Sequence, residues 1–466
     1  MSVTAPSMLA WCQTLLDVDG MRPRRELVDY LGAIPRLPSL ADLPSGTSVL
    51  VRGDVDAKPG ASVGEGDIRL RSMSATLRFG VERGWKQIIF GHIGRKGDES
   101  LDKVGRRLGQ IMGCDVPLIR DWLDESTMTV ADHASQAIHL SAPGSLLLLE
   151  NTRRYKIERV LWKAKPDELP KLADPLSRFA NEMAAKVAGV YVNEALSAGS
   201  LDASTTIVPA AMQRVSLGAY LAREFDGPML RCLATQLVVF SGLKIDKLDD
   251  LEAMIGRGTV TMVFAAGSLA MALKKAAAEL DGQSFSLGLA EDPAQADKPY
   301  YIPPERIEQA RRMIAQGRAK RIDFVLPVDF VLQDGRASEA IGPHDQQFDV
   351  GPRTSELFER KVGEFIAATR QKSAVAFYNG VFGMFEDPRF ASGTERFIGQ
   401  LKRLKEAGVE VYVGGGEGGA ALERYGAPDW VTHCFTAGGT VLNALGSQPV
   451  PYLVALSMAA QGAGRH

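Results

Sequence analysis

The sequence is poor in cysteine and histidine. Its 466 residues include 4 cysteines and 6 histidines, and the cysteines are scattered without a C-x-x-C pair. Neither residue type shows the spacing that zinc ligands require. The sequence therefore predicts a reducing compartment and no structural metal.

An excess of charge and a long apolar segment are also missing. The 54 Lys and Arg residues nearly balance 56 Asp and Glu residues, which argues against a nucleic-acid-binding protein. The longest uncharged apolar stretch, residues 258–273, is too short to cross a bilayer. The N-terminal residues lack the basic start and apolar core of a secretory signal. We therefore expect a cytoplasmic protein without nucleic-acid or membrane partners.

Short apolar runs alternate with amphipathic stretches from residue 46 onward, which is typical of βαβ units. A first series predicts strands at 48–51, 88–90, 146–149 and 190–192, with a helix at 69–84. A second series predicts strands at 237–240, 261–264, 324–326, 374–377 and 409–413. The pattern predicts an α/β fold with two similar-sized lobes joined by a hinge. Each lobe is expected to be a parallel sheet flanked by helices, in a Rossmann-like three-layer arrangement.

The two series are separated by residues 223–228, where a polar turn precedes a Gly-Pro pair. This break predicts an N-terminal lobe at 46–222 and a C-terminal lobe at 223–450. Residues 1–45 are expected to form an N-terminal extension that contains one helix. Residues 451–466 are expected to form a tail that returns to the first lobe.

Charged residues follow the predicted strands of the first lobe, at residues 52–56, 91–95 and 150–154. The carboxyl ends of parallel strands are where open α/β sheets bind ligands. Guanidinium groups match phosphate or carboxylate oxygens, so these arginines would form an anion pocket if they converge: Arg69, Arg95, Arg153 and Arg154. The alternative is that they are solvated or paired with neighbouring carboxylates.

Glycine takes the corresponding places in the second lobe. Residues 414–419 follow a predicted strand and open a predicted helix at 420–425, and a second glycine turn lies at 436–439. Backbone N–H groups at such a helix start can hold phosphate oxygens. The first segment satisfies G-x-G-x-x-G but lacks the acidic residue expected for a nicotinamide ribose, and no P-loop motif is present. Tight packing between strand and helix is the alternative explanation for either glycine run.

The order of these segments resembles that of phosphoglycerate kinase. Residues 52–56, 91–95, 148–153 and 191–195 stand where that family has Arg-Val-Asp-Phe-Asn, Ser-His-Leu-Gly-Arg, Leu-Leu-Glu-Asn-x-Arg and Tyr-Val-Asn-Asp-Ala. Second-lobe matches follow in the family's order at 241–244, 326–329, 349–352, 378–386, 414–417 and 436–439. The resemblance covers about residues 46–460.

The resemblance implies an ATP-dependent carboxylate kinase that uses Mg²⁺ and forms an acyl phosphate from a small carboxylic acid. The implied acid-binding residues are Asp54, Asp56, His92, Arg95, Arg153 and Arg154. The implied catalytic residues are Arg69, Lys244, Lys247, Gly438 and Gly439. The implied nucleotide-binding residues are Gly242, Gly267, Asn379, Glu386, Gly415, Gly416 and Glu417, of which Glu417 also holds the metal.

The chain departs from the family pattern mainly after residue 195. Leu201 stands where the family has a phosphate-binding arginine, and Ser200 and Ala203 replace two histidines. Asp56 replaces an asparagine and adds negative charge. The interval from Lys244 to Lys247 is one residue shorter than in the family.

Three hypotheses follow. The first is a carboxylate kinase that acts on an acid other than, or in addition to, 3-phosphoglycerate. The second is the ordinary glycolytic enzyme, and the third is a nucleotide-binding relative without catalytic activity. An active kinase would need a downstream enzyme to consume its acyl phosphate, and we expect the chain to be a monomer.

Overall fold

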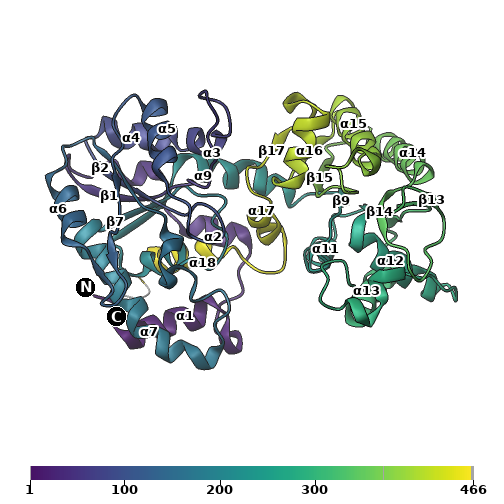
Figure 1. The fold of residues 1–466 in the computed structure, drawn as a ribbon, viewed down its shortest axis with the longest axis horizontal. Coiled ribbons are helices and arrows are strands. Elements are labelled where there is room, and N and C mark those ends of the chain that lie inside the picture. Colours follow the sequence, from purple (N-terminus) through teal and green to yellow (C-terminus); the bar gives the residue numbers. More distant parts are fainter. Residues whose placement is uncertain (1, 371, 463–466) are drawn as a thin grey trace. The chain divides into compact units, whose positions relative to one another are not determined.

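The computed structural model describes residues 2–370 and 372–462, which divide into two compact units (Figure 1). Unit 1 combines the described residues up to Gly227 with those from Pro449 onward, and unit 2 runs from Pro228 to Gln448. Each unit contains its own six-stranded sheet and its own hydrophobic core. No helix in the described part of the chain is long and apolar enough to span a membrane.

Unit 1 contains a parallel sheet with the strand order β3-β6-β2-β1-β7-β8. Its strands are β1 (Ser48–Arg52), β2 (Lys86–Phe90), β3 (Leu118–Ile119), β6 (Leu146–Leu149), β7 (Val190–Asn193) and β8 (Arg214–Leu217). A small antiparallel pair is formed by β4 (Leu123–Asp124) and β5 (Thr129–Val130). The central strands are buried along nearly their whole length, because helices cover both faces of the sheet.

The helices of unit 1 are α1 (Ala5–Leu15), α2 (Leu27–Ala33), α3 (Ile68–Ser72), α4 (Ser74–Glu82), α5 (Asp102–Met112), α6 (Asp132–Leu140), α7 (Leu169–Glu182), α8 (Ala203–Thr206), α9 (Ala219–Glu224) and α18 (Pro451–Ala460). The N-terminal segment is an integral part of this unit, because α1 packs against α7 and the Trp11 indole Nε1 donates to the Thr206 carbonyl at 2.8 Å. The C-terminal α18 packs against α2, α8 and β8. Both ends of the chain therefore support the short helix α8.

Unit 2 repeats the architecture with the parallel order β11-β10-β9-β15-β16-β17. Its strands are β9 (Leu237–Phe240), β10 (Met262–Ala265), β11 (Asp323–Val325), β15 (Val375–Asn379), β16 (Glu410–Val413) and β17 (His433–Cys434). An antiparallel sheet is formed by β12 (Phe330–Leu332), β13 (Ala337–Ser338) and β14 (Gln347–Val350). The helices are α10 (Leu230–Cys232), α11 (Lys247–Gly256), α12 (Gly267–Leu280), α13 (Pro304–Ala319), α14 (Pro352–Thr369), α15 (Ser392–Glu406), α16 (Glu417–Tyr425) and α17 (Gly438–Leu445).

The predicted fold class and each predicted strand are confirmed, with strand ends shifted by one or two residues. Two predicted helices differ in extent. The helix expected at 69–84 is divided at Met73 into α3 and α4. The helix expected at 420–425 begins at Glu417, because Gly416 makes the turn with φ +72°.

The polar turn expected at residues 223–228 is helical instead. Residues 225–229 form one wide π-helical turn between α9 and α10, and Gly227 and Pro228 lie inside it. Proline has no N–H to donate to the carbonyl four residues earlier, so this segment departs from regular α-helical bonding without ending the helix.

Candidate functional site

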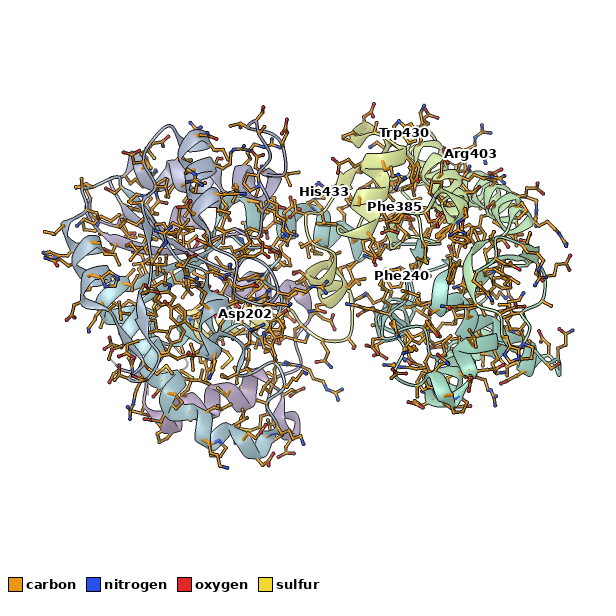
Figure 2. The ribbon with its side chains drawn as sticks, in the orientation of Figure 1. Asp202, Phe240, Phe385, Arg403, Trp430 and His433 are labelled. Atoms are coloured by element: carbon orange, nitrogen blue, oxygen red, sulfur yellow. The ribbon has the colours of Figure 1, made fainter. Side chains whose placement is uncertain are left out.

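The carboxyl edge of the unit 1 sheet carries polar residues from four neighbouring strands. Asp54 follows β1, His92 follows β2, Arg153 follows β6, and Asp202 (labelled in Figure 2) lies beyond β7. The order β6-β2-β1-β7 makes these strand ends adjacent. This is the edge at which open parallel sheets bind ligands.

Arg69 on α3 is held between two carboxylates at this edge. Its Nη1 donates to the carbonyl oxygen of Asp56 at 2.8 Å and to Oδ2 of Asp56 at 3.2 Å, and its Nε lies 3.9 Å from Oδ1 of Asp54. Asp54 is buried and accepts a hydrogen bond from the Ser197 hydroxyl at 2.6 Å. Burial opposes the charge of Asp56, but the Gly94 amide and the nearby basic side chains keep the pKa of its carboxyl below the usual value.

Asp202 organises the basic residues of the same edge. Its Oδ2 lies 3.3 Å from Nδ1 of His92 and 3.7 Å from Nη2 of Arg153. Arg153 also donates from Nη1 to the Gly94 carbonyl at 2.7 Å. Burial lowers the pKa of His92 below its ordinary value, so the imidazole is neutral at pH 7.

Sequence reasoning missed the role of Asp202. An aspartate directly before a short helix is normally a helix cap, and nothing in its sequence spacing connects it to His92 or Arg153. The only available signal was that it interrupts a segment in which the family is basic.

Two other predicted arginines lie apart from this group. Arg154 is exposed, and its Nη1 lies 3.8 Å from Oε2 of Glu150. Arg95 is exposed as well, and its backbone carbonyl accepts a hydrogen bond from Arg159 at 2.7 Å. Of the four arginines expected to converge, Arg69 and Arg153 pair with the aspartates of this group, whereas Arg154 pairs with the buried Glu150.

In unit 2 the loop after β9 carries both predicted lysines. Lys244 is exposed, whereas Lys247 begins α11 and folds back, so that its Nζ donates to the Ser241 carbonyl at 2.6 Å. Burial lowers the pKa of Lys247, Lys244 lowers it further, and the charge of Glu417 opposes the shift. The Lys247 ammonium group therefore lies at the carboxyl end of β9.

Glycines let three further strand ends of unit 2 approach one another closely. A Cβ on Gly414 would lie 2.4 Å from Nδ2 of Asn379, and one on Gly415 would lie 2.3 Å from the Phe435 carbonyl. A Cβ on Gly438 would lie 2.8 Å from the Gly415 carbonyl. Only glycine fits these positions, so the ends of β15, β16 and β17 form one compact backbone surface.

The helices that start at this surface have no side-chain cap. Neither Gly416 before α16 nor Ala437 before α17 has a side chain that caps the helix it precedes. Helix starts of this kind favour phosphate oxygens. This arrangement fits the phosphates of a nucleotide.

Gly267 brings the loop after β10 against the loop after β9. It has φ +62°, and a Cβ there would lie 2.7 Å from the Gly242 carbonyl oxygen. The Ser268 amide donates to the same oxygen at 3.1 Å. Gly242 and Gly267 therefore lie side by side at the carboxyl edge of the unit 2 sheet.

Glu417 and Glu386 are both exposed, Glu417 at the first position of α16 and Glu386 in the loop after β15. The described residues contain no cluster of three side chains that could hold a metal ion by itself. Mg²⁺ is usually bound through one or two carboxylates together with substrate phosphates. A single carboxylate at the glycine surface therefore fits magnesium that arrives with a nucleotide.

Solved structures of two proteins share this fold. The phosphoglycerate kinase from Pyrococcus horikoshii OT3 superposes with a TM-score of 0.68, covering 92% of this chain and 100% of its own at 22% identity. The phosphoglycerate kinase from Coxiella burnetii gives a TM-score of 0.64, covering 90% and 99% at 24% identity.

Comparison by sequence points to the same family. The cytosolic phosphoglycerate kinase of Triticum aestivum is 28% identical over 438 residues, which is 90% of this chain and 97% of the relative. The phosphoglycerate kinase of Candida glabrata is 27% identical over 411 residues, which is 84% of this chain and 90% of the relative. The family model described as phosphoglycerate kinase matches residues 41–448, which include the polar edges of both sheets. The chain therefore belongs to the phosphoglycerate kinase family.

Proposed function

We propose that this chain transfers a phosphoryl group between magnesium-bound ATP and the carboxylate of 3-phosphoglycerate, the reaction indicated by the names of its relatives. The observation that carries the proposal is the family match across both units. A carboxylate oxygen attacks the γ-phosphorus, the bond from that phosphorus to the β,γ-bridging oxygen breaks, and ADP leaves. The products are an acyl phosphate and ADP.

The unit 1 edge is proposed to bind the acid. Phosphoryl transfer depends on positioning and on stabilising charge more than on covalent catalysis. Arg69 is the cation proposed to meet the migrating phosphoryl group, because Asp54 and Asp56 already restrain its guanidinium. The residues proposed to hold the acid are Asp54, Asp56, His92, Arg95, Arg153 and Arg154.

The unit 2 edge is proposed to bind the nucleotide. The N–H groups at the starts of α16 and α17 would hold phosphate oxygens, and Gly267 would lie against the adenine. Lys244, Lys247, Gly438 and Gly439 are proposed to stabilise the transferring group, and Gly242, Asn379, Glu386, Gly415 and Gly416 to contact the nucleotide. Glu417 would ligate Mg²⁺, whose charge offsets that of the phosphates.

A second candidate function is the same transfer to a different acid. Leu201 removes a cation, and the buried Asp202 carboxylate adds negative charge beside His92 and Arg153. Both features disfavour an acid that brings a phosphate dianion to this edge. In either case we propose that a reductase or acyltransferase consumes the acyl phosphate, and that the chain acts as a cytoplasmic monomer.

The test is ADP release from magnesium-ATP, with hydroxylamine present to trap the acyl phosphate as a hydroxamate. The acids are 3-phosphoglycerate and a panel of small mono-, di- and amino-carboxylates, and an acid-free reaction measures background ATP hydrolysis. Hydroxamate formed with 3-phosphoglycerate at low millimolar or lower concentration supports the first candidate. Hydroxamate formed only with another acid supports the second.

One outcome would contradict both candidates. A chain that binds ATP but forms no hydroxamate with any acid would be a nucleotide-binding relative without catalytic activity. Direct measurement of ATP binding by calorimetry distinguishes this case from an inactive preparation.

A further inference from the structure

Asp202 has the position of a helix cap but does not act as one. It is the residue directly before α8, yet its side chain makes no capping hydrogen bond. The cap is supplied by Glu158, whose Oε2 accepts from the Ser204 amide at 2.8 Å and whose Oε1 accepts from the Ser204 hydroxyl at 2.6 Å. The carboxylate of Asp202 is therefore free to face the strand ends.

Three basic side chains from three strands surround one oxygen of this carboxylate. Oδ2 of Asp202 lies 3.3 Å from Nδ1 of His92, 3.7 Å from Nη2 of Arg153 and 3.8 Å from Nη2 of Arg52. The other oxygen, Oδ1, accepts from the Trp162 indole Nε1 at 2.8 Å. Asp202 is fully buried, and burial opposes its charge, but the nearby Arg52 and Arg153 guanidinium groups keep the pKa of its carboxyl below the usual value.

The carboxylate neutralises this cluster without satisfying its hydrogen bonds. Nη2 of Arg52 lies 2.8 Å from Nδ1 of His92, and because a guanidinium only donates, Nδ1 must be the acceptor. Within the described residues, Oδ2 of Asp202 then has no hydrogen-bond donor, and the buried Nε of Arg153 has no acceptor. Buried polar atoms without partners are uncommon in folded proteins, so the unmatched donor and acceptor set this cluster apart.

A phosphate would use these donors better than a carboxylate. It carries more charge and more oxygens, and guanidinium groups bind it through paired N–H groups. A phosphate dianion and the Asp202 carboxylate cannot both occupy the space among Arg52, His92 and Arg153, because two negative groups side by side in a buried space repel each other strongly. The chain's own carboxylate thus takes the place of an external anion.

We propose that Asp202 is a specificity-determining residue that acts as an internal counter-anion. It disfavours acids that would place a phosphate among Arg52, His92 and Arg153, and it favours acids that would place an uncharged group there. The inference rests on the proposed function in one respect, which is that the disfavoured ligand is an acid substrate. The presence of a blocked anion site does not depend on that function.

The test compares anion binding by the wild-type chain, Asp202→Asn and Asp174→Asn. Asp202→Asn removes the charge and keeps the shape. Asp174 is an exposed residue of α7 that pairs with Arg178, so its substitution changes net charge equally without touching the cluster. The probes are inorganic phosphate and 3-phosphoglycerate, measured by calorimetry and by the fluorescence of Trp162, which contacts both Asp202 and Arg153.

Asp202→Asn is expected to bind both probes about 10- to 100-fold more tightly than the wild-type chain, the value of one charge-assisted contact. Asp174→Asn is expected to match the wild type. Equal affinity in Asp202→Asn and wild type, or an equal gain in both variants, would overturn the proposal. If Asp202→Asn is unfolded in plain buffer, millimolar phosphate should restore its thermal transition, and failure to do so also overturns it.

These binding measurements contain no ATP, so they separate the two proposals. A gain in phosphate affinity without hydroxamate from any acid would retain the blocked anion site and reject the kinase. Hydroxamate from the wild-type chain without a gain in Asp202→Asn would retain the kinase and reject the role of Asp202.

Discussion

The two sheets of the molecule have the same architecture but carry different chemistry at their carboxyl edges. In unit 1 that edge consists of charged side chains, and the carboxylates Asp54, Asp56 and Asp202 lie against basic partners. In unit 2 glycine backbone, as at Gly415 and Gly438, forms much of that edge, and the charged side chains of Lys244, Glu386 and Glu417 are exposed. We therefore expect ligand recognition by side-chain charge in unit 1 and by backbone shape in unit 2.

The difference shows how each edge can change. A charged edge can be altered by one substitution, because an added carboxylate such as Asp202 neutralises several cations at once. An edge made of backbone tolerates a new side chain that points away from it. It is distorted by a new side chain whose Cβ would enter a close contact between two backbone segments. Replacements that remove charge in unit 1 or add volume in unit 2 test this contrast.

The largest effect is expected from Arg69→Ala. The substitution removes the cation that is proposed to contact the migrating phosphoryl group. It also removes the ion-pair partner of Asp54 and Asp56. Loss of one such donor typically lowers kcat by about 10²–10³-fold. The measurement is kcat in the hydroxamate assay, with the acid that the wild-type chain uses.

Arg71→Ala is the matched control, because Arg71 lies on the same helix but pairs with Asp67. It is expected to retain nearly wild-type kcat. An equal loss in both variants would indicate damage to α3 and not loss of a catalytic group.

A somewhat smaller effect is expected from Gly415→Ala. Its Cβ would lie 2.3 Å from the Phe435 carbonyl and 2.8 Å from the Ala437 amide nitrogen, so the loop must shift. Displacement of positioning groups by about 1 Å can cost about 10²-fold, and here the loss should appear in ATP binding. Calorimetric titration with ATP measures it, and affinity for the acid should stay unchanged.

Gly419→Ala provides the comparison for this prediction, because Gly419 belongs to the same glycine run but has no proposed ligand contact. A Cβ at Gly419 would lie 3.4 Å from the Cys434 Sγ, an ordinary contact distance, so ATP affinity should change little. If Gly419→Ala weakens ATP binding as much as Gly415→Ala does, steric shape is not what distinguishes these glycines.

The remaining prediction concerns pH and a buried carboxyl that is not among the proposed ligand contacts. Burial raises the pKa of Asp349 to about 7, although its oxygens accept from the Val350 and Gly393 amides. Between about pH 4 and 7 the folded chain holds a proton that the unfolded chain has released. The free energy of unfolding therefore falls as pH rises through this range, by roughly 1.4 kcal/mol per pH unit.

Asp349→Asn should remove this dependence. Denaturant unfolding from pH 4 to 8 should show wild-type stability declining relative to the variant up to about pH 7 and then holding level. The quantity to compare is the slope of the unfolding free energy against pH in the two proteins, which does not depend on the absolute stability of the variant. A constant difference across the range would mean that the Asp349 carboxyl ionises normally in the folded chain.

The strands were predictable because each is a short apolar run, and burial on both faces leaves that run visible in one dimension. Helix limits were less predictable. The division at Met73 and the continuation of helix through Gly227 and Pro228 depend on packing against neighbours that local sequence does not specify. The glycine runs indicated that backbone groups would approach closely, but not which strand ends would meet.

The sequence alone determined that this is a two-part α/β protein with a charged series of strand ends followed by a glycine series, because alternating hydrophobicity and ordered motifs are local properties. Tertiary structure decided the pairing of those charges. Asp202 is separated by 110 residues from His92 and by 49 from Arg153 along the chain, yet the strand order places all three at one edge. Charge compensation acts through space, so its pattern emerges only when the sheet has assembled.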